Sequence, residues 1–202
     1  MKRCRLFVGL FGTAEVVGRS LGSMGALLLF IGPFVGFVLS LAFGEWPGNL
    51  VDVTGYVAAS FLGLALSATP VSLIRPHSSV ARWLRGSRRA LGIAAYAYAF
   101  GHLVLYVADM ETLSNVLRDL AALGILLGWA AFFLLTPLFL TSNDFSVRHL
   151  GAKWKALHKA AYPAMVLVFL HWAFVHDNVV MAIVFMAPLL LMEIHRVSKN
   201  KS

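Results

Sequence analysis

Long apolar runs separated by short polar segments dominate the 202-residue chain. A helix that crosses a membrane needs about 20 mainly apolar residues, and several runs approach or exceed that length. These runs cover residues 21–44, 53–74, 90–108, 120–143, 157–176 and 178–195. The first run is longer than the apolar part of a cleavable signal peptide, so we interpret it as a span. The pattern therefore predicts a bundle of six transmembrane helices.

The composition agrees with this pattern. Hydrophobic residues make up 59% of the chain and charged residues only 13%, whereas soluble domains average about 25% charged residues. We see no internal repeat, no low-complexity tract and no linker long enough to separate domains. The sequence therefore predicts an all-α integral membrane protein with a single domain over residues 1–202.

Lysine and arginine fall almost entirely on one side of the predicted membrane. If the N-terminus is cytoplasmic, Arg118 is the only one of the 17 Lys and Arg residues in an outer segment. Cytoplasmic loops of membrane proteins are enriched in Lys and Arg. The chain is thus expected to be multi-pass, with both termini cytoplasmic. The net charge of +8 then reflects topology and contact with lipid, and we expect no nucleic-acid binding because no basic face with interleaved aromatics remains.

Several classes of chemistry are excluded by the residues present. Cys4 is the single cysteine, so there is no disulfide framework, no Cys-x-x-Cys zinc site and no covalent c-type haem attachment. The chain contains no Gly-rich nucleotide loop, no nucleophile elbow and no His-Glu-x-x-His motif. No domain for a nicotinamide cofactor is visible, so electrons for any redox reaction must come from elsewhere.

Two histidines lie at matched depth in the predicted membrane. At about 1.5 Å per residue, His102 lies about 20 Å beyond Arg89, and His171 lies roughly 18–24 Å beyond the basic residues that precede its span. A histidine inside an apolar span costs free energy unless it has a use. A haem iron takes two axial ligands, and neutral imidazole supplies them. We therefore interpret His102 and His171 as axial ligands of one haem iron in the outer half of the bundle.

Two other uses of this pair are open: hydrogen bonding between packed helices, and a proton relay or small transporter that titrates the histidines. A transporter is expected to show inverted repeats or broken helices in matched halves, and we find none. A proton path usually strings acids through the spans, and none lies in mid-membrane. The sequence therefore favours a transmembrane electron conduit.

A third histidine, His158, lies near the inner surface, about 20 Å from His171. Arg89 stands where the third span would supply a second histidine at that depth. The sequence places cations and an aromatic ring near His158 at the inner surface. We call them the inner-mouth residues: Arg88, Arg89, Lys153, Trp154 and Lys155. Such a set suits a flat, phosphate-bearing ligand. A second haem ligated by His158 is the alternative, and a basic rim required only by topology is the third.

Three segments resemble a known family. They are "TGYVAASFLGLALSATPVSLIRP", "RRALGIAAYAYAFGHLVLY" and "LGAKWKALHKAAYPAMVLVFLHW". In order and spacing they are similar to the second, third and fifth helices of the haem-binding membrane subunit of bacterial protein-methionine-sulfoxide reductase systems. That family lies within the ferric-reductase-like transmembrane superfamily. The resemblance spans roughly residues 53 to 176.

The resemblance implies a b-type haem protein of the bacterial inner membrane, with His102, His171 and His158 as candidate iron ligands. It implies electron delivery from the quinone pool or a cytosolic flavin reductase to a periplasmic molybdenum-containing subunit, which reduces methionine sulfoxide in proteins. Flavin mononucleotide is also attributed to the family. Catalytic reduction is therefore expected on a separate subunit. A different acceptor, such as an extracellular metal or another redox subunit, is the alternative.

The predicted outer loops carry most of the acidic residues, and Trp46 and His176 flank the expected electron exit. We expect a periplasmic partner to dock on this face with salt-sensitive affinity.

Overall fold

The computed structural model describes residues 48–176 and Ala187. The predicted spans over residues 21–44 and 178–195, and Trp46, lie outside the described residues. Within 48–176 the chain is helical and contains no strand. The helices are α2 (Gly48–Ile74), α3 (Ser79–Asp109), α4 (Leu113–Asp119), α5 (Leu123–Leu140), α6 (Asp144–Leu150), α7 (Ala152–His158) and α8 (Ala161–Val175).

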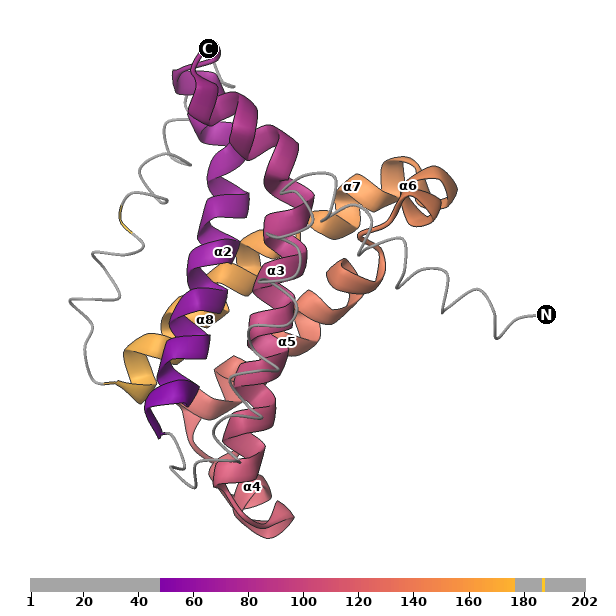
Figure 1. The fold of residues 1–202 in the computed structure, drawn as a ribbon. Coiled ribbons are helices and arrows are strands. Elements are labelled where there is room, and N and C mark those ends of the chain that lie inside the picture. The colour runs from indigo at the N-terminus through magenta and orange to yellow at the C-terminus, as the bar shows by residue number, and fades with distance from the viewer. Residues whose placement is uncertain (1–47, 177–186, 188–202) are drawn as a thin grey trace, which may run out of the picture.

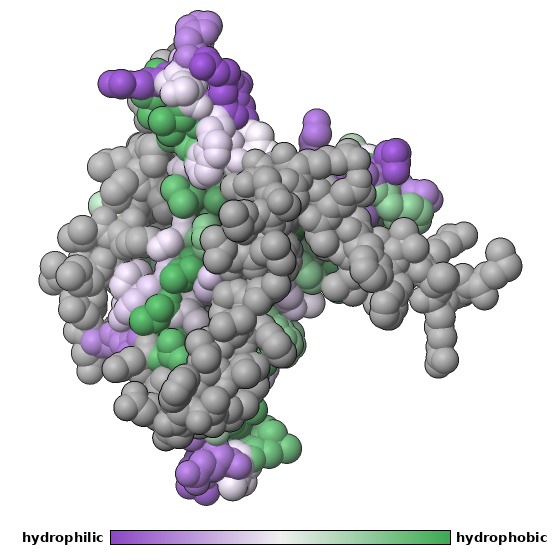
Figure 2. Space-filling model, in the orientation of Figure 1, coloured by the Kyte–Doolittle hydropathy of each residue, from purple (hydrophilic) through white to green (hydrophobic). Residues whose placement is uncertain are grey.

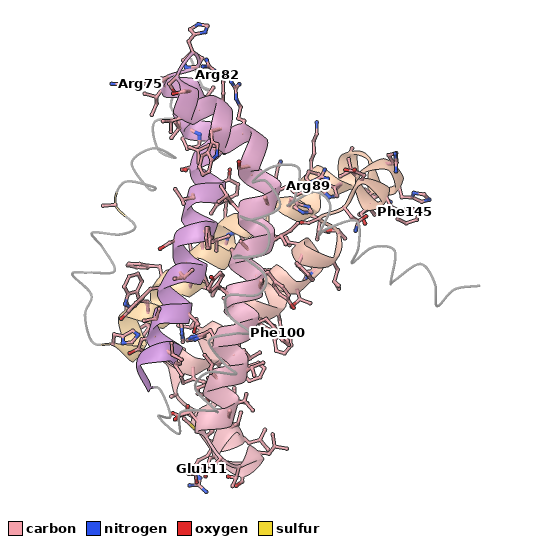
Figure 3. The ribbon with its side chains drawn as sticks, in the orientation of Figure 1. Arg75, Arg82, Arg89, Phe100, Glu111 and Phe145 are labelled. Atoms are coloured by element: carbon pink, nitrogen blue, oxygen red, sulfur yellow. The ribbon has the colours of Figure 1, made fainter. Side chains whose placement is uncertain are left out.

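Three of the described helices are long and apolar enough to cross a membrane: residues Leu50–Ile74 of α2, all of α3, and α5. Helix α8 has 15 residues and is shorter than these. Figure 2 shows hydrophilic residues at the two ends of the long helices, and Figure 3 shows Glu111 at the opposite end from Arg75 and Arg82. Over the described residues a helical membrane protein is confirmed, whereas the number of spans and the side of each terminus stay predictions.

Helix α3 extends well beyond the predicted span at 90–108. It begins at Ser79 because the Ser78 side chain accepts a hydrogen bond of 3.0 Å from the Ala81 backbone N–H. It ends before Glu111, whose φ of 59° no longer fits a helix. Its 31 residues amount to about 46 Å at 1.5 Å per residue, against a membrane core of about 30 Å. Arg82, Arg85, Arg88 and Arg89 are therefore part of the same helix as the predicted span.

The predicted span at 157–176 is divided in the structure: α7 ends at His158 and α8 begins at Ala161. Pro163 explains the break. Its ring clashes with the carbonyl of residue i−4, which is Lys159, so a continuous helix through this point is disfavoured. In the first turn of α8 a backbone N–H has no acceptor within the helix, so the N–H that Pro163 lacks is not missed there. His158 and His171 consequently lie on different helices.

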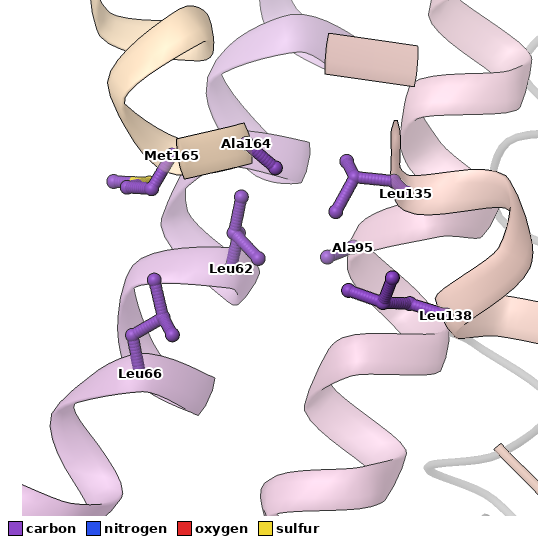
Figure 4. Close-up of a cluster of buried hydrophobic side chains, with 7 residues drawn as sticks. All are labelled: Leu62, Leu66, Ala95, Leu135, Leu138, Ala164 and Met165. Carbon is purple, nitrogen blue, oxygen red and sulfur yellow. The ribbon is translucent and has the colours of Figure 1, made fainter. Parts of the chain in front are cut away.

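The long helices associate in two pairs, α2 with α3 and α5 with α8, while α6 and α7 project to one side (Figure 1). A buried apolar cluster holds the two pairs together, and Figure 4 shows its members. They come from all four helices: Leu62, Leu66, Ala95, Leu135, Leu138, Ala164 and Met165. Within the first pair, Ala65 and Ala68 pack against Leu84 and Leu91. Small residues such as these allow helix backbones to approach closely.

Candidate functional site

The two pairs bring His102 of α3 and His171 of α8 face to face. Their ring centroids are 6.1 Å apart, and the ring planes lie at 79° to each other. The structure thus brings together two residues that are far apart in the sequence, at the matched depth that the helical rise predicts. Neither ring is fully buried, because both border an open space between the pairs.

Each of these rings is oriented by a backbone carbonyl of its own helix pair. His102 Nδ1 lies 2.7 Å from the Val51 carbonyl oxygen of α2. His171 Nδ1 lies 2.7 Å from the Gly124 carbonyl oxygen of α5. A carbonyl oxygen only accepts, so each Nδ1 carries the hydrogen and donates it. The lone pair is then on Nε2, which is the nitrogen left for a metal.

Two glycines make room for these rings. A Cβ atom at Gly55 would lie 3.1 Å from His102 Nδ1, and one at Gly128 would lie 2.7 Å from His171 Nδ1. Each glycine comes one helical turn after the carbonyl that holds its ring, since Gly55 follows Val51 and Gly128 follows Gly124. Both pairs therefore use the same local arrangement. The sequence analysis gave Gly128 no role, although a glycine inside an apolar helix often marks a close approach.

The space between the pairs is a cavity of about 160 Å³, named here the paired-histidine cavity. Both histidines line it, and most of its other walls are small or apolar. These walls include Gly55, Ala58, Ala59, Ala95, Ala99, Gly128, Ala131, Phe132 and Leu135. Small side chains of this kind leave a slot that a flat macrocycle can enter.

One end of the paired-histidine cavity is polar and aromatic. Asp52, Tyr56, Trp172 and His176 line it there. His176 Nε2 lies 3.7 Å from Asp52 Oδ1, and the Tyr56 ring lies 4.9 Å from the Trp172 ring. His176, expected beside the electron exit, therefore borders the same cavity as the two facing histidines.

A second cavity, named here the basic cavity, measures about 880 Å³. Its charged lining residues are all cationic: Arg85, Arg88, Arg89, Lys155 and Lys159. Trp154 and His158 line it as well, so four of the five predicted inner-mouth residues, Arg88, Arg89, Trp154 and Lys155, lie around one cavity together with His158. Lys153 is not among the lining residues. The sequence analysis did not select Arg85, because its approach depends on how α3 is rotated.

Some of these cations already have partners. Arg89 forms an ion pair with Asp144 of α6, and Arg88 donates to Thr69 Oγ1 over 3.2 Å. Among the described residues, no ion pair involves Lys155 or Lys159. Within the described part of the chain, the positive charges of Arg85, Arg88, Lys155 and Lys159 are thus not offset by an ion pair.

The aromatic platform predicted at Trp154 is partly occupied. The His158 ring stacks on it, with centroids 3.9 Å apart and planes at 25°, and the indole N–H donates to the Thr141 carbonyl over 2.8 Å. His158 Nδ1 lies 3.1 Å from the Trp154 carbonyl oxygen, and His158 Nε2 lies 3.4 Å from Ser142 Oγ. No second histidine is among the described residues that line the basic cavity, so the structure shows no facing histidine pair there.

Comparison with known proteins identifies the family of the chain. The family described as "Ferric reductase like transmembrane component" matches residues 54–169, which include His102 and His158 and stop short of His171. The "Protein-methionine-sulfoxide reductase heme-binding subunit MsrQ" of Rhizobium meliloti (strain 1021) is 38% identical over 154 residues, covering 73% of this chain and 68% of that protein. The corresponding subunit of Polaromonas naphthalenivorans (strain CJ2) is 39% identical over 127 residues, covering 61% of this chain and 56% of that protein.

A relative of another kind is "Magnetosome protein MamZ" of Magnetospirillum gryphiswaldense, which is 38% identical over 152 residues. The match covers 71% of this chain but only 22% of that protein, so it corresponds to one part of a longer chain. No solved structure matches. By the family match and the coverage of its relatives, the chain belongs to the ferric-reductase-like transmembrane family and, within it, to the haem-binding subunits of protein-methionine-sulfoxide reductases.

Proposed function

We propose that the paired-histidine cavity binds one b-type haem, with His102 and His171 as the axial ligands of its iron. The separation of the two rings supports this most directly. A metal–imidazole bond of about 2.0 Å, plus about 1.1 Å from that nitrogen to the ring centre, taken on both sides, predicts centroids about 6 Å apart. The observed separation is 6.1 Å.

The rest of the cavity fits the same ligand. Both rings keep Nε2 for the iron because Nδ1 donates to a carbonyl, and the neighbouring walls are small and apolar. When bound, haem supplies a one-electron redox centre whose potential depends on its ligands and surroundings. The residues of this chain hold the imidazoles in one tautomer and orientation and keep the site largely free of charged groups.

The function that follows is electron transfer through a membrane. We propose a multi-pass subunit of the bacterial inner membrane, with both termini cytoplasmic, that passes electrons to a periplasmic molybdenum-containing subunit reducing methionine sulfoxide in proteins. The names of the similar subunits support that acceptor. Quinol or a cytosolic flavin reductase is the proposed donor. The similarity to a magnetosome protein favours, as the second candidate, a conduit to a different acceptor.

We further propose that the basic cavity binds flavin mononucleotide. Its charged lining residues are cationic and suit a phosphate group. A second bis-histidine haem needs a partner for His158, and none is among the described lining residues. A haem held by His158 and another ligand is the competing occupant.

Spectroscopy of the purified protein tests the haem assignment. His102→Ala and His171→Ala should each abolish the low-spin spectrum of a bis-histidine haem, because one axial ligand is lost. His149→Ala is the matched control, since His149 stacks on Phe145 of α6 and lines neither cavity. Normal haem content and spectrum in both single variants would show that the assignment is wrong.

A further inference from the structure

Three aromatic rings form a continuous stack between the two cavities. The Tyr96 ring of α3 lies 5.3 Å from Phe132 at 19° and 4.4 Å from Phe139 at 15°, both on α5. Phe132 lines the paired-histidine cavity, whereas Tyr96 and Phe139 line the basic cavity. The stack therefore begins at the wall of one cavity and ends in the wall of the other.

The described side chains that line both cavities are aliphatic. Leu62 and Leu135 line both cavities, and they belong to the buried cluster of Figure 4. No charged or histidine side chain of the described chain lines both cavities. The stack thus provides a route with delocalised electrons past these aliphatic side chains.

The Tyr96 ring is held in a defined position. Its hydroxyl lies 3.3 Å from Thr136 Oγ1. Thr136 gives its own hydrogen to the Phe132 carbonyl over 2.9 Å, so the phenol is the donor to Thr136. The phenol proton therefore has a fixed acceptor, and the ring is kept nearly parallel to both phenylalanines.

We propose that the Phe132–Tyr96–Phe139 stack is the bridge through which electrons cross from the basic cavity to the paired-histidine cavity. This inference rests on the proposed function, because it requires haem at His102 and His171. One electron leaves a donor in the basic cavity, a reduced flavin or in the test dithionite, and that donor is oxidised. The haem iron is reduced from ferric to ferrous. No bond forms or breaks, and the phenol keeps its proton.

The physical reason is that electron transfer slows steeply as the gap between the donor and the acceptor widens. Stacked rings fill that gap with polarisable, delocalised electrons, whereas the neighbouring leucines supply only saturated groups. A stack that served packing alone requires bulk at Tyr96 and Phe139 but has no need of aromatic character. Leucine keeps much of the bulk and removes the aromatic character, so it separates these two roles.

The experiment uses the full chain with haem, reconstituted in vesicles, and dithionite added to one side of the membrane at a time. Tyr96→Leu and Phe139→Leu should slow haem reduction from the basic-cavity side several-fold and leave reduction from the opposite side unchanged. Tyr96→Phe should behave like the natural protein because it keeps the ring. Phe100→Leu is the matched control: Phe100 is one turn further along α3 (Figure 3) and lines neither cavity, although its ring lies 6.4 Å from Phe132.

Haem content and the absorption spectrum are measured on every variant. Unchanged reduction from the basic-cavity side in both leucine variants would overturn the bridge. Equal slowing from both sides, or loss of haem in both variants, would also overturn it in favour of a packing role. Failure of the proposed function has a different signature, since the natural protein would then lack a haem reducible from either side.

Discussion

The paired-histidine cavity and the basic cavity lie on opposite sides of one apolar cluster, yet they differ in nearly every physical property. The first measures about 160 Å³ and places two oriented imidazoles 6.1 Å apart. The second measures about 880 Å³, and its charged lining residues are all cationic. In the first cavity the space that the glycines leave for the histidine rings is the main feature, and in the second it is the net positive charge of the lining residues. The comparison indicates that the first site is specified by geometry and the second by electrostatics.

The two sites should therefore respond differently to substitution. A geometric site is sensitive to a change of one methyl group, because packed interiors have little room to adjust. A charged, partly exposed site responds weakly to the loss of one charge, because solvent screens it.

The largest effect is expected from the glycines beside the histidines. Gly128→Ala places a Cβ 2.7 Å from His171 Nδ1, so the ring must move and lose its bond to the Gly124 carbonyl. Overpacking of this kind costs about 1–3 kcal/mol, which corresponds to a loss of haem affinity of roughly 5-fold to 150-fold. Gly55→Ala should reduce haem affinity by less, because its Cβ would lie 3.1 Å from His102. Haem titration of the purified variants measures both.

Gly92→Ala is the control for this series, since a Cβ at Gly92 meets nothing within 4 Å. It should leave haem affinity unchanged and, because alanine favours helices over glycine, raise stability slightly. Full haem content with an unaltered spectrum in Gly128→Ala would contradict the geometric account of the paired-histidine cavity.

An effect of intermediate size, on the affinity for flavin mononucleotide, is expected from the loss of one cation in the basic cavity. Lys155→Gln should lower the affinity for flavin mononucleotide roughly threefold, because one partly screened cation is lost. Lys153→Gln, on the same helix α7 but outside the lining, should have no effect. Fluorescence titration with flavin mononucleotide at low and moderate salt measures both, and the difference should shrink as salt rises.

The variant His158→Ala tests the same difference between the two cavities. It should leave the haem spectrum at His102 and His171 intact, since His158 lies in the other cavity. Two haems per chain, one of them lost in His158→Ala, together with no retained flavin, would replace the flavin assignment with a second haem.

The smallest effect is expected from Asp144→Asn. This change leaves Arg89 without its ion-pair partner at a largely exposed position, where Asp144 is 64% exposed. Stability should change by less than about 1 kcal/mol. Affinity for flavin mononucleotide should rise slightly, because Arg89 no longer has a competing carboxylate. Thermal unfolding and flavin titration measure the two quantities, and weaker flavin binding would contradict this role of Asp144.

The apolar runs were sufficient to predict an all-helical membrane protein, because the need to keep backbone polar groups paired in lipid leaves helices as the local solution. The matched depth of His102 and His171 also followed from the sequence, since rise per residue is a local property of a helix. The break between α7 and α8 was harder to predict from the sequence. Pro163 marks it, but a proline alone does not decide between a kink and two separate helices.

Rotation about the helix axes and packing between helices were decided only by the tertiary structure. The clearance that Gly128 provides for His171, the inclusion of Lys159 and not Lys153 in the basic cavity, and the stacking of His158 on Trp154 all depend on neighbours far away in the sequence. The same holds for the Tyr96 stack between two helices. Hydropathy and spacing determine what each helix is and how deep each residue lies. Which face meets which partner depends on interactions between helices, and no single segment contains that information.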